Sequence, residues 1–307
     1  MAFEEYVRNE IVADCAEGYL TRREALRRLM LLGVGAATAA TLLAGCGEDE
    51  PAIDSGGTSS STGPSSTTAA AGAAAPVGPA PLATEAVTFA GPAGQIKGSW
   101  SAAPTPTGSV LIIHENQGLT PHFVTLPGRL AASGYSALAV DLLSRKGGTD
   151  AFSDLAQATA ALTGTPLPDL LADARAGLDE LLRRVPGHKA AAVGFCFGGG
   201  MVWSLLAAGE DRLAAAVPFY GPLPQSHDFS RAKAAVLAIY GETDTRVNDT
   251  QPAAVAALQA AKLPHEIKVL AGAGHAFFNE AKPDRFNATA AADAYTTMLE
   301  WFVRYLS

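Results

Sequence analysis

Cysteine is scarce in this chain: among its 307 residues only Cys15, Cys46 and Cys196 carry a thiol. Three cysteines are too few for the several disulfides that stabilise many small secreted proteins. The six histidines include no pair at the spacing with which one helix binds zinc. We therefore expect no metal site and no cofactor.

Clusters of positive charge are also missing. Residues 47–307 hold 17 Lys and Arg against 24 Asp and Glu, and the whole chain has a formal net charge of −8. Nucleic acids and anionic lipid surfaces are bound by basic patches. We therefore expect neither to be a partner of the folded part, and we expect a monomer.

An apolar stretch at residues 29–44 is short for a membrane span and rich in alanine and glycine. A positive segment with a twin-arginine pair precedes it, and Leu-Ala-Gly-Cys at 43–46 resembles a bacterial lipobox. We predict that residues 1–46 are a twin-arginine-type lipoprotein signal peptide. The mature chain would be exported to the cell envelope and tethered by lipid on Cys46.

Two alternatives remain open for this leader. It could be a short, uncleaved membrane anchor. It could also follow the general export route, because Ala25 stands where twin-arginine signals usually have a bulky apolar residue.

The rest of the chain divides into a linker and one domain. Residues 47–84 are rich in Ser, Gly, Ala and Pro and should form a disordered linker, because they cannot bury enough apolar surface to offset the entropy of ordering. Residues 85–307 alternate strand and helix patterns, which predicts a doubly wound, mostly parallel α/β sheet with helices on both faces. The expected strands are 85–89, 96–100, 110–114, 135–140, 190–193, 213–219, 236–240 and 265–270, and the main expected helices are 123–132, 167–184 and 288–306, besides one that starts near residue 200.

Residues 194–199, Gly-Phe-Cys-Phe-Gly-Gly, place a cysteine between a short apolar strand and a helix of small residues. The glycines permit a sharp turn whose tip carries the Cys196 side chain clear of the sheet. The turn lies at a helix N-terminus, where the dipole and backbone N–H groups favour an anion. Cys196 is therefore a candidate nucleophile; the alternative is a buried cysteine in a glycine-rich bend.

Two further strands end beside reactive residues. Asp244 follows the strand at 236–240, and His275 follows the strand at 265–270. Cysteine, aspartate and histidine thus occur in the chain order of an α/β-hydrolase triad, and open α/β sheets form their sites at this edge. Each residue alone could belong to an ordinary loop, but the three together predict a catalytic triad.

Four motifs together resemble the dienelactone hydrolase family of α/β-hydrolases. They are Gly-Phe-Cys-Phe-Gly-Gly at 194–199, Gly-Glu-Thr-Asp-Thr-Arg-Val at 241–247, Gly-Ala-Gly-His-Ala-Phe at 272–277 and the strand and loop at 110–119. The resemblance covers about residues 85–307. It implies the α/β-hydrolase fold and cleavage of an ester or lactone without a cofactor.

The three triad residues divide the chemistry. Cys196 would attack the carbonyl carbon and form an acyl-thioester. His275 would hold the thiol proton and later activate water, while Asp244 would orient the imidazole.

The resemblance adds three groups to this triad. The backbone N–H groups of Phe197 and Asn116 would form the oxyanion hole. Glu115 would pair with the thiol in the resting enzyme and help to generate the thiolate when substrate binds. The alternative for Glu115 is a buried carboxylate that is satisfied by backbone or by a lysine.

The chain departs from the family four residues after His275. Well-known members carry an arginine there that holds the carboxylate of dienelactone, whereas this chain has Asn279 and no nearer arginine than Arg285. Arg145 and Arg246 border the expected site and could take its place. We therefore expect a broader carboxylesterase acting on a small-molecule ester or lactone.

Two other functions remain possible from sequence. The chain could be a non-catalytic envelope lipoprotein that binds a ligand or partner on a hydrolase scaffold. It could also be a thiol peptidase, although the domain shows no added lid.

Overall fold

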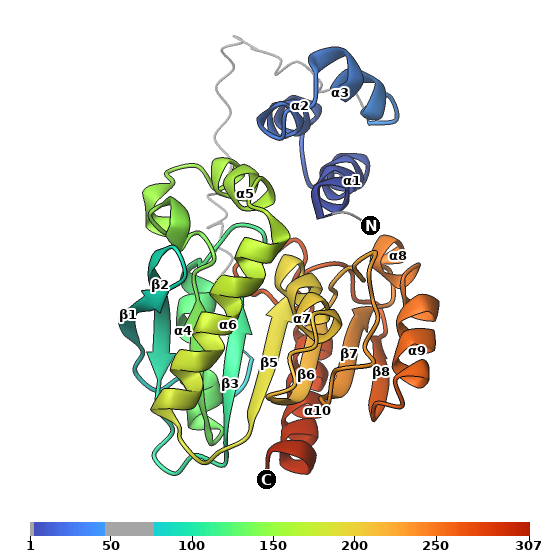
Figure 1. Ribbon diagram of the computed structural model, residues 1–307. Helices are drawn as coiled ribbons and strands as arrows, with labels where there is room; N and C mark the ends of the chain where they lie inside the picture. The colour runs from blue at the N-terminus through green and yellow to red at the C-terminus, as the bar shows by residue number, and fades with distance from the viewer. Residues whose placement is uncertain (1–2, 47–76) are drawn as a thin grey trace, which may run out of the picture.

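A single eight-stranded sheet lies at the centre of the computed structural model, which describes residues 3–46 and 77–307 (Figure 1). The strands follow the order β1-β2-β4-β3-β5-β6-β7-β8 across the sheet. Strand β2 is antiparallel to its neighbours β1 and β4, and all pairs from β4 to β8 are parallel. In chain order the strands are β1 (Glu85–Gly91), β2 (Gly94–Ser101), β3 (Gly108–Ile113), β4 (Tyr135–Val140), β5 (Ala190–Phe195), β6 (Leu213–Phe219), β7 (Ala235–Gly241) and β8 (His265–Leu270).

The central strands are buried from end to end, which explains their continuous apolar sequences. Every residue of β3, β4, β5 and β7 is buried. Parallel strands reach this state because the helices of the crossover connections cover both faces. The predicted doubly wound α/β-hydrolase fold is therefore confirmed.

Four long helices cover the two faces of the sheet. Helices α6 and α7 lie in front of it in Figure 1, and α4 and α10 lie behind it. The two rear helices are joined where the Tyr295 hydroxyl donates to the backbone oxygen of Arg129 at 3.1 Å. Their bounds are α4 (Pro121–Ala132), α6 (Leu167–Arg184), α7 (Phe197–Ala207) and α10 (Ala288–Leu306).

Most expected elements are confirmed, with ends that differ by a few residues. Asn287 caps the last helix, since its side chain accepts a hydrogen bond from the Ala290 N–H at 3.1 Å. Three shorter helices were not predicted, because they are short, and the longest two are alanine-rich with little apolar periodicity. They are α5 (Leu155–Thr163), α8 (Thr245–Asn248) and α9 (Gln251–Ala260).

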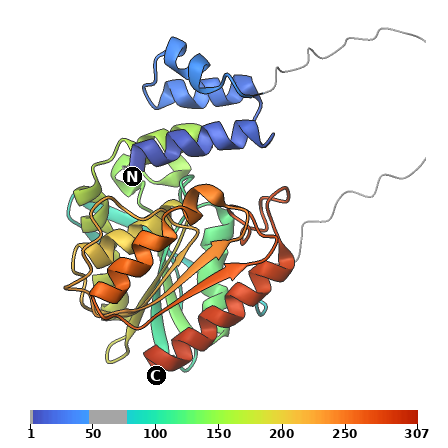
Figure 2. The same cartoon turned by 90° about the vertical axis from the view of Figure 1, so that its right-hand side faces the viewer.

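Three helices occupy the N-terminal region that we predicted to be only a leader. They are α1 (Phe3–Ala16), α2 (Arg22–Leu31) and α3 (Ala36–Leu42). They lie above the edge of the sheet at which the parallel strands end (Figures 1 and 2). In the described part of the chain, no helix combines the length and apolar character that crossing a membrane requires.

The predicted linker falls mostly outside the described residues, which resume at residue 77. From there to residue 84 the chain already contacts the domain: the N–H of Leu82 donates to the oxygen of Gly128, and the Ser101 hydroxyl donates to that of Ala83. Contact with the domain therefore begins before the predicted boundary at residue 85.

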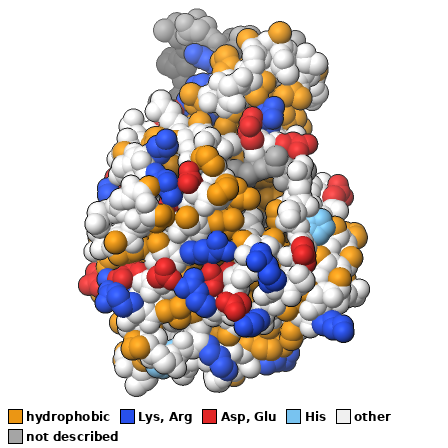
Figure 3. Space-filling view, in the orientation of Figure 1, with side chains coloured by type: hydrophobic (Ala, Val, Ile, Leu, Met, Phe, Trp, Pro, Cys, Tyr) orange, Lys and Arg blue, Asp and Glu red, His pale blue; other side chains and the backbone are white. Residues whose placement is uncertain are grey.

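On the face shown in Figure 3, positive and negative side chains are interspersed rather than gathered by sign.

Candidate active site

Cys196 occupies a sharp turn between β5 and α7. Its φ is +53° and its ψ is −115°, a conformation that few residues other than glycine adopt. The turn requires close approach of backbones, because a Cβ on Gly194 would lie 2.0 Å from the oxygen of Gly198. A Cβ on Gly198 would in turn lie 2.1 Å from the oxygen of Ile113. The glycines of the motif therefore let the cysteine stand at the tip of the turn, as expected.

Asp244 and His275 meet beside this turn. Oδ2 of Asp244 lies 2.6 Å from Nδ1 of His275, a hydrogen-bonding distance. The other carboxylate oxygen of Asp244 accepts from the Val247 N–H at 3.4 Å, which fixes the carboxylate at the start of α8. The imidazole of His275 lies beside the thiol: one of its ring nitrogens is within 4.8 Å of Sγ of Cys196.

The loops that carry these two residues are tied together. The N–H of Thr243 donates to the oxygen of Ala273 at 2.9 Å, and the N–H of Glu242 donates to that of Leu270 at 3.0 Å. Because β7 and β8 are neighbouring parallel strands, both loops leave the same edge of the sheet. The separation of Asp244 and His275 is thus set by the sheet.

Charges in the site reinforce one another. Burial alone would lower the pKa of His275, but the adjacent Asp244 and Cys196 outweigh it and raise this pKa well above its ordinary value. Burial likewise opposes ionisation of Asp244, yet His275 outweighs it and lowers the pKa of the aspartate. The pair is therefore held as imidazolium and carboxylate.

Glu115 has different partners from those that the resemblance implies. Oε2 accepts from Nζ of Lys282 at 2.7 Å and from the amide of Asn279 at 3.1 Å, and Oε1 accepts from the Tyr220 hydroxyl at 3.4 Å. Among the described residues, Glu115 makes no hydrogen bond to Cys196. The expected resting pair of Glu115 and thiol is thus absent, and the structure matches the alternative of a buried carboxylate satisfied by a lysine.

This contact also shows what replaces the missing arginine. Asn279 occupies the position four residues after His275 and, together with Lys282, binds the Glu115 carboxylate. Burial opposes the charge of Glu115, but Lys282 outweighs it and lowers the pKa of that carboxyl. Sequence reasoning missed Lys282, because a lysine in a loop has no motif of its own. The Tyr220 ring also packs against His275, with ring centroids 5.2 Å apart.

The two arginines proposed at the site edge have other partners. Arg145 pairs with Asp173 at 2.6 Å. Arg246 lies over the ring of Tyr6, with its guanidinium carbon 4.2 Å from the ring centroid. Of the two, only Arg246 therefore contacts a residue that reaches the thiol.

Two residues of α1 reach the reactive atoms. The Tyr6 hydroxyl lies 3.6 Å from Sγ of Cys196 and 3.4 Å from Nε2 of His275. Oε1 of Glu10 lies 3.7 Å from the same sulfur and 3.6 Å from the same nitrogen. Neither residue was singled out from sequence, because residues 1–46 were treated only as a leader.

Glu10, Cys196 and His275 also form a set of possible metal ligands. Their ligand atoms lie within 4.8 Å of one another, and oxygen, sulfur and nitrogen ligands of this kind bind zinc. The sequence argument expected no metal and did not include Glu10. That expectation stays a prediction.

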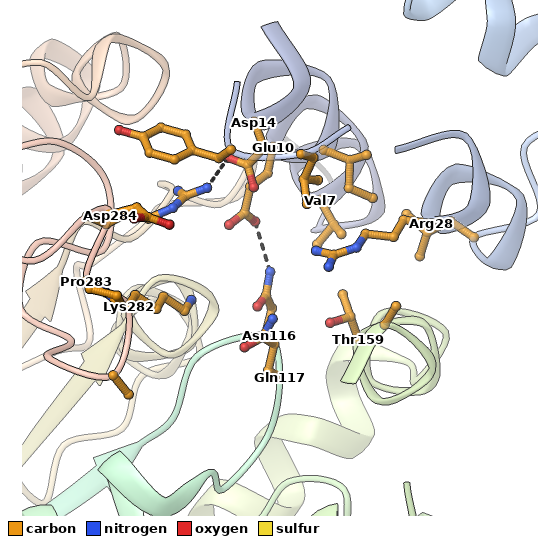
Figure 4. Close-up of a pocket in the computed structure, with 17 residues that line it drawn as sticks. Val7, Glu10, Asp14, Arg28, Asn116, Gln117, Thr159, Lys282, Pro283 and Asp284 are labelled. Carbon is orange, nitrogen blue, oxygen red and sulfur yellow. Dashed lines mark hydrogen bonds and ion pairs between the residues drawn. The ribbon is translucent and has the colours of Figure 1, made fainter. Parts of the chain in front are cut away.

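One predicted oxyanion donor is next to Cys196 in sequence, and the other follows a neighbouring strand of the sheet. Phe197 directly follows Cys196 as the first residue of α7. Asn116 lies in the loop after β3, which is the neighbour of β5 in the sheet. The Asn116 side-chain amide donates to Oε2 of Glu10 at 3.0 Å (Figure 4). The oxyanion hole itself stays a prediction.

Two cavities adjoin the site. One of about 270 Å³ lies between the N-terminal helices and the loops after β3 and β8, and is shown in Figure 4. The other, of about 700 Å³, reaches Phe197 and is bordered by Tyr6. Its walls include apolar side chains from α6, α7 and the loop after β6: Leu167, Leu170, Leu171, Met201 and Pro222.

A cysteine turn, an aspartate and a histidine at the carboxyl edge of this sheet define an α/β-hydrolase. Residues 97–306 match the profile of the Dienelactone hydrolase family. A protein of Escherichia coli O157:H7, provisionally named a carboxymethylenebutenolidase, is 33% identical over 231 residues, which cover 70% of this chain and 82% of that protein.

Solved structures give the same result. A protein of Klebsiella pneumoniae, provisionally described as a dienelactone hydrolase, matches with a TM-score of 0.62 and 28% identity over 73% of this chain and all of its own. A dienelactone hydrolase-like promiscuous phosphotriesterase from metagenomic libraries matches with a TM-score of 0.66 and 27% identity, covering 74% of this chain and 100% of its own. The chain therefore belongs to the dienelactone hydrolase family and is a hydrolase.

Proposed function

We propose that this hydrolase cleaves carboxylic esters or lactones through Cys196, His275 and Asp244, by way of an acyl-thioester. The observation that carries the proposal is the 2.6 Å contact between His275 and Asp244 beside the turn that presents Cys196. A nucleophile, a base and a group that orients the base are the parts that covalent acyl transfer requires.

Each step uses one of these groups. The thiolate of Cys196 attacks the carbonyl carbon while His275 keeps the thiol proton as imidazolium. The backbone N–H groups of Phe197 and Asn116 bind the oxyanion. The leaving oxygen takes the proton from His275. The imidazole then removes a proton from water, which attacks the thioester, releases the acid and restores the thiol.

The substrate we infer is a neutral or weakly polar ester with an apolar part. The cavity of about 700 Å³ that reaches Phe197 has apolar walls, and apolar groups bind such walls by leaving water. The position that carries a carboxylate-binding arginine in the resembled family holds Asn279, whose amide is engaged by Glu115. These two features favour a general carboxylesterase over an enzyme dedicated to dienelactone.

We also propose that the chain is an exported lipoprotein held to the cell envelope through Cys46. The twin-arginine segment and the Leu-Ala-Gly-Cys sequence at 43–46 support this proposal. Cys46→Ser, expressed in a bacterium, should move the protein from the membrane fraction to the soluble fraction. Continued membrane attachment would instead favour an uncleaved anchor.

The catalytic proposal is tested by replacing the sulfur. The Tyr6 hydroxyl and a Glu10 carboxylate oxygen lie 3.6 and 3.7 Å from the sulfur of Cys196, so the parent chain for this test carries Tyr6→Ala/Glu10→Ala. Adding Cys196→Ser should lower kcat/KM for p-nitrophenyl acetate by about 10³-fold or more, because a serine hydroxyl ionises far less readily than a thiol. Cys46→Ser makes the same atomic change away from the site and should leave the rate unchanged.

Three results would contradict the proposal in different ways. Equal turnover by the Cys196→Ser chain, or turnover unaffected by a thiol alkylator, would remove Cys196 from its role. No turnover of any ester by folded protein would favour a binding protein on a hydrolase scaffold. Cleavage of peptides in preference to esters would favour a thiol peptidase.

A further inference from the structure

Helix α1 fills the space that a substrate needs. An acyl carbon must come within about 3–3.5 Å of the attacking sulfur. The Tyr6 hydroxyl and a Glu10 carboxylate oxygen already lie 3.6 and 3.7 Å from Sγ of Cys196. The same two groups lie 3.4 and 3.6 Å from Nε2 of His275. A substrate therefore cannot reach the thiol while α1 is in place.

The groups that α1 places here are polar, which ordinary packing of a helix does not explain. Tyr6 is 1% exposed and Glu10 is 7% exposed. Burial of a carboxylate is costly unless it finds partners. The partners of Glu10 all lie in the site. Its Oε1 faces the thiol of Cys196 and the imidazole of His275, and its Oε2 accepts from the Asn116 side-chain amide at 3.0 Å. A carboxylate in this position resembles the acid product of ester hydrolysis.

Tyr6 is likewise matched to its surroundings. Arg246 covers one face of the ring at 4.2 Å, a cation–π contact. Burial, and then the nearby Cys196 and Glu10, raise the pKa of Tyr6 well above its ordinary value, so the phenol stays protonated. The neutral hydroxyl can donate to the sulfur or to the imidazole.

Contacts outside the site hold the helices in place. Asp14 near the end of α1 pairs with Arg285 at 2.6 Å, and Arg285 also lies 4.3 Å from the ring centroid of Tyr19. On the far side, Arg27 of α2 pairs with Asp154 at 2.6 Å. The N-terminal helices are therefore held at two places, on the loop after β8 and at the start of α5.

We propose that residues 3–31 form an internal inhibitor of this hydrolase, in which Tyr6 and Glu10 occupy the site of the acyl group. The inference rests on the proposed function for the roles of Cys196 and His275. The inhibitor precedes the predicted cleavage point. Hydrolysis of the Gly45–Cys46 peptide bond by a signal peptidase, with water as the second reactant, separates residues 1–45 from the domain. The hydrolase is therefore inactive until the bond before Cys46 is cut and the N-terminal helices dissociate.

The inhibitor is tested by loosening α1 in the full chain. Tyr6→Ala/Glu10→Ala should accelerate two processes by about tenfold or more: turnover of p-nitrophenyl acetate and modification of Cys196 by iodoacetamide, followed by peptide mass spectrometry. Glu5→Ala removes an exposed carboxylate from the same helix and should change neither rate. Thermal unfolding of each variant checks that the domain remains folded.

The two readouts separate this inference from the proposed function. Faster modification of Cys196 without ester turnover in any chain would support the inhibitor and overturn the esterase proposal. Equal modification and turnover rates in the unaltered and the Tyr6→Ala/Glu10→Ala chains would overturn the inhibitor.

A second experiment needs no change in α1. A protease recognition sequence is placed within residues 47–76 of the full chain, and the folded protein is cut. Turnover and Cys196 modification should both rise once the fragment is diluted away, and a synthetic peptide of residues 3–31 should reverse the rise. If neither rate changes after the fragment has been removed, the inhibitor does not exist.

Discussion

The sheet domain and the N-terminal helices are held by different kinds of interaction. In the domain, backbone ladders join eight strands, and four of these are buried along their whole length. The N-terminal helices have no strand in this sheet. Their buried apolar residues, such as Val7 and Leu29, join the core cluster, and the ion pairs of Asp14 with Arg285 and of Arg27 with Asp154 add to this attachment. The backbone ladders of the sheet involve none of these contacts. The domain should therefore persist when the helices leave, as a removable inhibitor requires.

The largest expected effect comes from comparing one glycine substitution in the sheet domain with one in the N-terminal helices. Gly198→Ala would put a Cβ 2.1 Å from the backbone oxygen of Ile113, which cannot move without breaking the turn at Cys196. We expect the free energy of unfolding to fall by more than about 4 kcal/mol. Gly35→Ala, at the N-cap of α3, meets nothing within 4 Å and should lower it by about 1 kcal/mol at most, since alanine is a poorer cap than glycine.

Chemical denaturation followed by circular dichroism measures both variants. Equal losses would mean that the N-terminal helices are packed as tightly as the domain, against the comparison above.

The sequence predictions succeeded for the sheet domain and missed the contacts that the N-terminal helices make with it. Strands β4 and β6 and helices α6 and α10 were predicted with their observed bounds, because long buried runs and amphipathic periodicity are properties of the local sequence. The positions of Asp244 and His275 followed from strand ends, since a parallel sheet brings those ends to one edge.

The residues that sequence reasoning missed act through tertiary contacts. Lys282 reaches Glu115 across 167 positions of the chain, and Glu10 reaches Cys196 across 186. No local pattern marks either partner. The features that predicted a leader, the twin-arginine pair and the Leu-Ala-Gly-Cys sequence, also gave no indication that α1 would contact the candidate active site.

A second test compares two ion pairs, one within the domain and one between the regions. Lys282→Met leaves Glu115, whose side chain is 2% exposed, without its cation. We expect the free energy of unfolding of the domain to fall by about 3 kcal/mol, since an unpaired buried charge is costly. Arg285→Met removes the partner of Asp14 and should mainly speed the modification of Cys196 by iodoacetamide.

Adding Glu115→Gln to Lys282→Met removes the orphaned charge and should recover much of the lost stability. No recovery would show that Lys282 acts by packing and not by charge.

The smallest expected effect concerns a largely buried ion pair of the domain whose contribution to stability is lost at low pH. His122 and Arg129 pair with Glu280 and, against its burial, lower the pKa of that carboxyl from 4.5 to about 2. Since the folded value lies below the unfolded one, this stabilisation is complete above pH 4.5 and is lost as the pH falls through about 2. Glu280→Gln should therefore lower the free energy of unfolding by about 2 kcal/mol near neutrality, and the difference should shrink over that range.

Glu24 of α2 provides the matched control. Hydrogen bonds from Arg27 and Arg28 lower its pKa to about 2 as well, but its side chain is 30% exposed. Glu24→Gln should leave the unfolding of the domain unchanged at every pH. A pH-dependent loss of equal size in both variants would show that the helices and the domain unfold as one unit.

The most direct test of the account is to isolate the acyl-enzyme. The Tyr6→Ala/Glu10→Ala chain is mixed with p-nitrophenyl acetate, quenched in acid within the first turnovers and digested for mass spectrometry. The account predicts an acetyl group on the sulfur of Cys196, and its accumulation when Asp244→Asn slows the deacylation that needs an oriented His275. Turnover that leaves Cys196 unmodified, with the acetyl group on another residue or on none, would contradict it.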